Sequence, residues 1–418
     1  MLNHEKWFRV DNVAKVFLAT HNQRDTRSLR ISCTLKQPVI PELLSEALAK
    51  TVKTRNVFQV RIRRGVFWHY MEPISTIPEV TEEYERPCPV LYGKNYRGVL
   101  HYKVTYFGNN INFDIFHALT DGTGAADFLN NLVLNYLKLR YPDELSDVSV
   151  GFSAAESELE QDSFRKFYEK GDISGTASGK AYHMRGLKLP YDQLQFFRVS
   201  MPASKIKKDA KAAGTGITSY IGARLMMSLY RDMPSLRRNL PVTVINPVNL
   251  RNYYDTETAR NFFNSVSVSH VFTGRETLEE LAKEFEINLK SALEPDNIKK
   301  RMNHYQKIER ILALRAVPLI LKQPVVKYAA RRDSRSVSAV LSNLGVISVP
   351  DELKSYISGY TLYCSHSDLY MSMCTYDDRI VMGITCGLRN TNVLRDFISG
   401  FAADGTDVEL QATEVVKT

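Results

Sequence analysis

The stretch "NINFDIFHALTDGTGAADFLNNLVLNYLKL", residues 110–139, carries the strongest structural pattern in this chain. Ile111, Phe113, Ile115 and His117 occupy every second position, so they share one face of a predicted β-strand. The first three of these side chains are apolar, and such a face packs against a core. We therefore expect His117 to continue the apolar face at the end of the strand and to point into the protein.

The segments on both sides of this strand indicate a hairpin and a helix. Residues 98–107 read as the partner strand, and Gly108-Asn109-Asn110 tolerate positive φ, which favours a turn between the two. Residues 126–139 place apolar side chains at helical spacing, namely Phe128, Leu129, Leu132, Val133, Tyr136 and Leu137. The pattern H-x-x-x-D-G, residues 117–122, therefore lies between a buried strand and an amphipathic helix.

Further strand-like and helix-like patterns cover most of the chain. The chain has 418 residues, a length that favours more than one lobe. Strands and helices mix in each half, which predicts an α/β fold in two layered lobes. The polar, Gly- and Ser-rich residues 142–192 are interpreted as the connection. We place an N-terminal lobe carrying the H-x-x-x-D-G pattern at residues 1–187, and a second lobe at residues 188–418.

Prolines set the expected element ends in the second half. Pro247 is expected to end an apolar strand that begins near Leu240, because proline cannot donate a hydrogen bond to a neighbouring strand. A helical region over about 276–330 is expected to be interrupted at Pro295, Pro318 and Pro324.

Composition excludes several classes of protein. The hydrophobic fraction of 44% and the charged fraction of 24% are those of an ordinary globular protein, and no run of 18 apolar residues predicts a membrane span. The N-terminal segment is polar and lacks the apolar centre of a signal peptide. The five cysteines include no C-x-x-C pair, which argues against a disulfide framework or a zinc site. We expect a reducing, cytoplasmic setting.

The net charge of +9 favours an anionic partner, but no nucleic-acid-binding motif accompanies the basic residues. Other catalytic signatures are also missing. The string "GTGAAD" at 122–127 lacks the third glycine of the dinucleotide fingerprint. There is no G-x-S-x-G nucleophile elbow, and the histidines show no metal-ligand spacing. We therefore predict no metal and no nucleic acid.

The H-x-x-x-D-G pattern resembles the signature of the coenzyme-A-dependent acyltransferase superfamily, which includes chloramphenicol acetyltransferase and the condensation domains of peptide synthetases. "NPVNLR" (246–251) and "SNLGVISVP" (342–350) are similar to two segments of its second lobe. "FRVDNVAKVF" (8–17) is similar to the start of bacterial alcohol-acetyltransferase-like proteins. Condensation domains usually carry a second histidine where this chain has Phe116, and the D-F-G-W-G motif of plant enzymes is absent. The resemblance therefore favours the bacterial alcohol-acetyltransferase branch.

The resemblance implies two lobes with an active-site tunnel between them, and an acyl-CoA or phosphopantetheine thioester as donor. His117 would be the general base. Asp121 would either orient His117 or form a structural ion pair with Arg251, the alternative that the resemblance favours. Gly122 would permit a special backbone angle or a close approach.

The resemblance also points to the loop of residues 342–345. Ser342 and Asn343 are candidate donors to the oxyanion of a tetrahedral intermediate. Gly345 would keep this loop narrow beside the pantetheine arm.

The acceptor is expected to be a small-molecule alcohol, or an amine. Two alternatives stay open at this point. One is an enzyme of condensation or acyl transfer that takes its donor from an acyl carrier protein. The other is a non-catalytic binding protein on the same fold.

Overall fold

The structure is a computed structural model of the chain. It describes residues 7–412 apart from 95, 97, 150–155, 171–178, 191–192, 311–315 and 367. Much of the expected connection between the lobes therefore lies outside the described residues.

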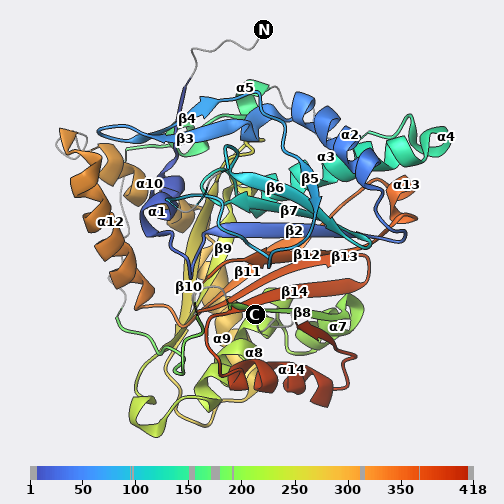
Figure 1. The fold of residues 1–418 in the computed structure, drawn as a ribbon. Coiled ribbons are helices and arrows are strands. Elements are labelled where there is room, and N and C mark those ends of the chain that lie inside the picture. Colours follow the sequence, from blue (N-terminus) through green and yellow to red (C-terminus); the bar gives the residue numbers. More distant parts are fainter. Residues whose placement is uncertain are drawn as a thin grey trace.

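In the described residues the strands form three sheets, and Figure 1 shows the two larger ones across the middle of the molecule. The strands are β1 (Phe8–Arg9), β2 (Ser28–Leu35), β3 (Val60–Arg64), β4 (His69–Pro73), β5 (Val80–Glu82), β6 (Tyr102–Phe107), β7 (Asn110–Phe116), β8 (Gln195–Pro202), β9 (Val242–Asn249), β10 (Phe263–His270), β11 (Ala339–Val346), β12 (Ile357–Cys364), β13 (Leu369–Tyr376), β14 (Arg379–Cys386) and β15 (Glu409–Ala412).

Helices cover the sheets on their outer faces and at one edge (Figure 1). The helices are α1 (Asn12–Thr20), α2 (Pro41–Thr54), α3 (Gly122–Arg140), α4 (Pro142–Leu145), α5 (Glu156–Leu159), α6 (Ser163–Lys166), α7 (Ala203–Ala212), α8 (Ile217–Arg231), α9 (Leu278–Ala292), α10 (Pro295–Arg310), α12 (Leu319–Ser334), α13 (Asp351–Lys354) and α14 (Asn392–Ala403). Short 3₁₀ turns lie at Asn56–Phe58, Ser235–Arg237 and Leu250–Asn252.

The first large sheet has the order β12-β2-β7-β6-β5 and contains the hairpin expected from the sequence. Strands β6 and β7 pair in antiparallel register, with Phe107 opposite Asn110. Helices α2 and α3 pack against each other, and α3 packs on β2 and β7. The side chains Ile111, Phe113 and Ile115 are all fully buried, as the alternating pattern predicts.

The second large sheet has the order β10-β9-β11-β13-β14-β8-β15 and is covered by α7, α8, α9 and α14. A mixed α/β fold built on two large sheets is therefore confirmed. Strands β9 and β11 pair only through Val244 and Ile245, opposite Ala339 and Val340, and then separate. The sheet is thus held together at one end of these strands only.

Strand β12 crosses between the two halves. It follows α13 in the chain of the second half, but it pairs with β2 along its length and so belongs to the first sheet. It also packs on β13 and β14 of the second sheet. The expected boundary between residues 187 and 188 therefore does not separate the two sheets.

Two proline predictions are wrong. Strand β9 continues through Pro247, which lies opposite Ser265 of β10. Proline is tolerated there because β11 has already separated from β9, so no neighbour needs its missing N–H. Pro324 lies inside α12, which continues to Ser334.

The start of α3 also differs from the expected residue 126. The helix begins at Gly122, because the carboxylate of Asp121 accepts hydrogen bonds from the amides of Thr123 and Gly124 and caps it. The loop between β7 and α3 is therefore only five residues long, from His117 to Asp121. Among the described residues, no helix combines the length and the apolar character required to span a bilayer.

Candidate active site

Asp121 joins the first half of the chain to the second. Its Oδ1 accepts the two cap hydrogen bonds of α3, each 3.1 Å long. Its Oδ2 accepts from Arg251 Nη1 at 2.8 Å and from the Phe262 amide at 2.9 Å. Four donors therefore surround this nearly buried carboxylate, and none of them is the ring of His117.

Arg251 lies just after β9, and its guanidinium is fixed by several acceptors besides Asp121. It donates to the carbonyl oxygens of Thr258 and Arg260 and to Asn249 Oδ1, over distances of 2.7–3.1 Å. The two predicted partners, Asp121 and Arg251, thus contact each other, and only 7% and 11% of their side chains are exposed. This geometry matches the ion-pair alternative and leaves no hydrogen bond for the triad alternative.

His117 follows the last residue of β7, at the place where the two halves of the chain meet. Its amide donates to the carbonyl oxygen of Arg27, which prolongs the pairing of β7 with β2 by one residue. Phe17 of α1 packs against the imidazole with ring centroids 4.4 Å apart, and Phe263 of β10 lies 5.7 Å away. The side chain is half-buried, whereas the strand residues before it are fully buried.

Asn261 is a partner of His117 that sequence reasoning missed. Its Nδ2 donates to the His117 carbonyl oxygen at 2.9 Å and to Asp11 Oδ2 at 3.4 Å. The amide must therefore present its Oδ1 to His117 Nδ1, which is 3.2 Å away. It follows that Nδ1 carries the proton and that Nε2 is the basic nitrogen. The string "RNFF" at 260–263 contains this residue, but nothing in its pattern identifies the contact.

Burial controls the charge state of these groups. Burial lowers the pKa of His117 below its ordinary 6.5, although its hydrogen bonds and the charge of Asp121 act in the opposite direction. The imidazole is therefore neutral at pH 7. Asp11, which caps α1, has its pKa raised to about 6 by burial, partly offset by Arg260.

The prediction for Gly122 is wrong, and the close approach belongs to its neighbour Gly124. Gly122 has no left-handed φ, and an added Cβ would lie 3.4 Å from the Leu344 side chain, an ordinary contact. A Cβ on Gly124 would lie 2.2 Å from Thr120 Oγ1 and 2.3 Å from the Ala259 carbonyl oxygen. Only glycine at 124 lets α3 approach the segment that carries Ala259.

The segment 342–345 lies at the end of β11, where its pairing with β13 shifts register after Asn343. Asn343 donates from Nδ2 to Thr218 Oγ1 at 3.0 Å and accepts from the Gly345 amide at 2.8 Å. Its exposed side chain is therefore used to hold this loop. Gly345 has φ +86°, which glycine adopts easily, and an added Cβ would meet no atom within 4 Å. Ser342 is half-buried and contacts Tyr370.

A second histidine, His366, lies at the same edge of the first sheet as His117. His366 follows β12 as His117 follows β7, and β2 lies between these two strands. Two strand spacings place the backbones of the two histidines roughly 10 Å apart. The Asp368 amide donates to His366 Nδ1 at 3.2 Å, and burial lowers the pKa of His366. Arg27 of the intervening chain has a left-handed φ of 52° and pairs with Asp25.

No group of His, Cys, Asp and Glu that could hold a metal ion occurs in the described part of the chain. All five cysteines are free and buried.

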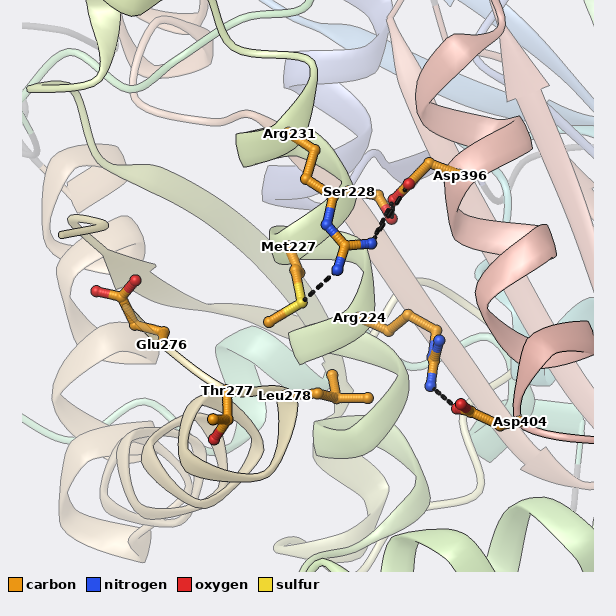
Figure 2. Close-up of a pocket in the computed structure, with 9 residues that line it drawn as sticks. All are labelled: Arg224, Met227, Ser228, Arg231, Glu276, Thr277, Leu278, Asp396 and Asp404. Atoms are coloured by element: carbon orange, nitrogen blue, oxygen red, sulfur yellow. Dashed lines mark hydrogen bonds and ion pairs between the residues drawn. The ribbon is translucent and has the colours of Figure 1, made fainter. Parts of the chain in front are cut away.

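One cavity of about 300 Å³ lies elsewhere, among α8, α14 and the start of α9 (Figure 2). Four of its five charged side chains pair with each other, Arg224 with Asp404 and Arg231 with Asp396 at 3.2 Å. The fifth, Glu276, lies 3.5 Å from His270. All lining residues come from the second half, and none is a histidine or cysteine. This cavity therefore takes no part in the His117 site.

No protein-family model and no curated protein matches this chain in sequence. Solved structures do match. The trichothecene 15-O-acetyltransferase TRI3 from Fusarium sporotrichioides superposes with a TM-score of 0.63 at 13% identity, covering 94% of each chain. Polyketide synthase associated protein 5 from Mycobacterium tuberculosis superposes with a TM-score of 0.61 at 13% identity, covering 94% of this chain and 96% of the other.

The first condensation domain of the CDA synthetase also matches, with a TM-score of 0.61 at 13% identity over 96% of this chain and 95% of the other. The chain has the fold of these proteins. The two-lobed acyltransferase-like architecture expected from the sequence is therefore confirmed. At this identity the likeness establishes the fold alone.

Proposed function

We propose that this protein is an acyltransferase that moves an acyl group from a coenzyme A thioester to an alcohol or amine, with His117 as general base. The observation that carries the proposal is the hydrogen bond between His117 Nδ1 and Asn261 Oδ1. A proton on Nδ1 donated in this bond leaves Nε2 as the basic nitrogen. A neutral, oriented imidazole is what the reaction requires.

The proposed step is direct transfer. His117 Nε2 removes the proton from the acceptor hydroxyl while its oxygen attacks the thioester carbonyl. The tetrahedral intermediate then collapses, the carbon–sulfur bond breaks, and the imidazolium returns the proton to the departing thiolate. Such positioned proton transfer contributes about 10²–10⁴ in rate. The nearby charge of Asp121 favours the transient imidazolium.

Asp121 and Arg251 would position this base rather than touch the substrate. Their ion pair connects the loop that carries His117 with the segment that carries Asn261. In the intermediate, the oxyanion needs a donor. Ser342 and Asn343 are the candidates, and in the structure Ser342 contacts Tyr370 while the side-chain amide of Asn343 donates to Thr218. Gly345 and the open space around it suit a narrow substituent such as a pantetheine arm.

Two fold neighbours support coenzyme A as the donor. The TRI101 enzymes of F. sporotrichioides and F. graminearum have been solved with coenzyme A and T-2 toxin, at TM-scores of 0.60 and 0.59 and 11% identity. The residue before His117 favours the alcohol-acetyltransferase branch. Phe116 is fully buried and stacks on Tyr92 at 5.0 Å, so the position is part of the aromatic core. The five free thiols suit the proposed cytoplasmic location.

Donation from an acyl carrier protein is the second candidate, and the likeness to a condensation domain favours it. Thiol release from acetyl-CoA separates the candidates. Purified protein is incubated with acetyl-CoA and a panel of alcohols and amines, and free thiol is followed with DTNB. The protein's own cysteines are all buried, which keeps the background low.

We expect acceptor-dependent release by the wild type and a loss of about 10²–10⁴ in rate for His117→Ala. His183→Ala is the control, since that ring hydrogen-bonds the Arg335 carbonyl oxygen, away from the site. Release from acetyl-loaded carrier protein but not from acetyl-CoA would favour the second candidate. Equal release by wild type and His117→Ala would refute catalysis by His117, and no release from either donor would favour a binding protein.

A further inference from the structure

Helix α12 has an unusual surface. It packs on α1 at the outer edge of the molecule (Figure 1). Its outward side carries four large apolar side chains that are 61–71% exposed, namely Ile320, Leu321, Val325 and Tyr328. A surface helix of a globular protein normally turns such residues toward the core. Exposed apolar residues that gather in this way mark an interaction site.

The tip of the β3–β4 hairpin extends this apolar surface. The Leu319 amide at the start of α12 donates to the Val66 carbonyl oxygen, and Lys322 Nζ donates to the Phe67 carbonyl oxygen. Val66 is 68% exposed, and Phe67 and Trp68 are each 39% exposed. The hairpin tip and α12 therefore form one continuous surface.

Aromatic residues are concentrated on the small sheet behind this tip. The chain contains two tryptophans, and both lie here: Trp68 at the tip and Trp7 beside β1. Trp7 is 53% exposed and contacts the edge of Tyr70, which lies on β4. Arg9 lies over the Trp68 ring at 5.3 Å. Tryptophan and tyrosine side chains are enriched at membrane–water interfaces.

The charge of α12 has one sign over most of its length. Lys322, Lys327, Arg331 and Arg332 occur between residues 316 and 332, and no acidic residue occurs among them. Exposed aliphatic, aromatic and basic side chains on one surface suit an anionic bilayer, which takes apolar groups between its headgroups and attracts cations.

We propose that α12 and the β3–β4 hairpin tip dock this protein onto membranes that contain anionic lipid. The docking surface comprises Val66–Trp68, Trp7 and the outward side of α12. Helix α1 lies between α12 and the site, and its Phe17 packs on His117. Docking therefore brings the candidate site close to the bilayer. The proposal does not depend on acyl transfer and can be tested without an activity assay.

Tryptophan emission of the unmodified protein provides the test, because both tryptophans lie in the proposed surface. The protein is titrated with vesicles of phosphatidylcholine, alone or mixed with phosphatidylglycerol, and binding is measured in parallel by co-sedimentation. We expect a blue shift and co-sedimentation with the anionic vesicles. Binding should be weaker with phosphatidylcholine alone and should fall as salt is added.

Variants separate the contribution of the apolar side chains to membrane binding from that of the basic side chains. Leu321→Glu with Val325→Glu should weaken partitioning by more than roughly tenfold, because two apolar side chains can no longer enter the bilayer. Arg331→Gln with Arg332→Gln should weaken it by roughly fivefold for each charge removed. Ile287→Glu on α9 is the matched control, since Ile287 and Val325 are both 68% exposed. This control should bind like the wild type.

Three results would overturn the proposal. The first is neither a blue shift nor co-sedimentation with anionic vesicles. The second is equal weakening by Ile287→Glu and by the α12 variants, which would indicate unspecific attraction. The third is a concentration-dependent dimer, or a complex with an acidic protein, that the α12 variants abolish while vesicle binding is absent. The surface would then be a protein interface.

Discussion

Replacing Asp121 with alanine should destabilise the whole fold, because this carboxylate forms an ion pair with Arg251 and also caps helix α3. Its loss leaves the guanidinium of Arg251, 11% exposed, without its anionic partner at 2.8 Å. Removing one member of a buried ion pair costs about 3–5 kcal/mol. The helix α3 also loses its cap, which costs about 1 kcal/mol. We therefore expect Asp121→Ala to lower the free energy of unfolding by about 4–6 kcal/mol.

Asp121→Asn separates the contribution of the ion pair to stability from that of the helix cap. The asparagine oxygen can still accept from the amides of Thr123 and Gly124, so the cap is kept while the charge is lost. This variant should be about 1 kcal/mol more stable than Asp121→Ala. Urea unfolding followed by circular dichroism at pH 7 measures both.

Glu279→Gln is the control for a general charge effect. Glu279 pairs with Lys283 at 2.7 Å, but both side chains are more than half exposed, so its loss should leave the urea midpoint nearly unchanged. The reasoning is refuted if Asp121→Ala unfolds at the wild-type urea concentration. If that stable variant had also lost thiol release, Asp121 would act on the chemistry instead.

Three further predictions concern the site. Burial lowers the pKa of His117, so its basic form persists at mildly acidic pH and kcat/KM should fall only below pH 6.5. A midpoint of the pH profile of kcat/KM at or above 6.5 would contradict this environment of His117. Asn261→Ala should lower kcat with little change in KM, because the imidazole of His117 loses the hydrogen bond that orients it. Asn264→Ala is the control and should leave kcat unchanged, since Asn264 is also buried but its side-chain amide donates to the Ile298 carbonyl oxygen. Equal losses of kcat in the two variants would remove the case for a fixed tautomer. Gly124→Ala should lower the free energy of unfolding by about 1–3 kcal/mol, and Gly122→Ala should lower it much less. The reverse order would contradict the close approach of α3 at Gly124.

The amino-acid sequence by itself determined the hairpin, the helix after it and the position of His117 between them. These features depend on residues within one or two turns of each other, so their periodicity is visible in residues 98–139. The same local patterns predicted most other strands and helices. The assignment of Pro247 as a strand end was wrong because the effect of a proline in a sheet depends on whether a neighbouring strand needs its N–H. Pro324 removes one backbone hydrogen bond of α12, but the helix still continues to Ser334.

Only the tertiary structure decided what surrounds His117. Asn261 is 144 residues away in the chain, and no local pattern couples the two. The crossing of β12 into the first sheet and the close approach at Gly124 likewise depend on how distant segments pack. Periodicity specifies which face of an element is buried, but it does not specify which element covers that face. The partner of a buried polar group is therefore set by the path of the whole chain.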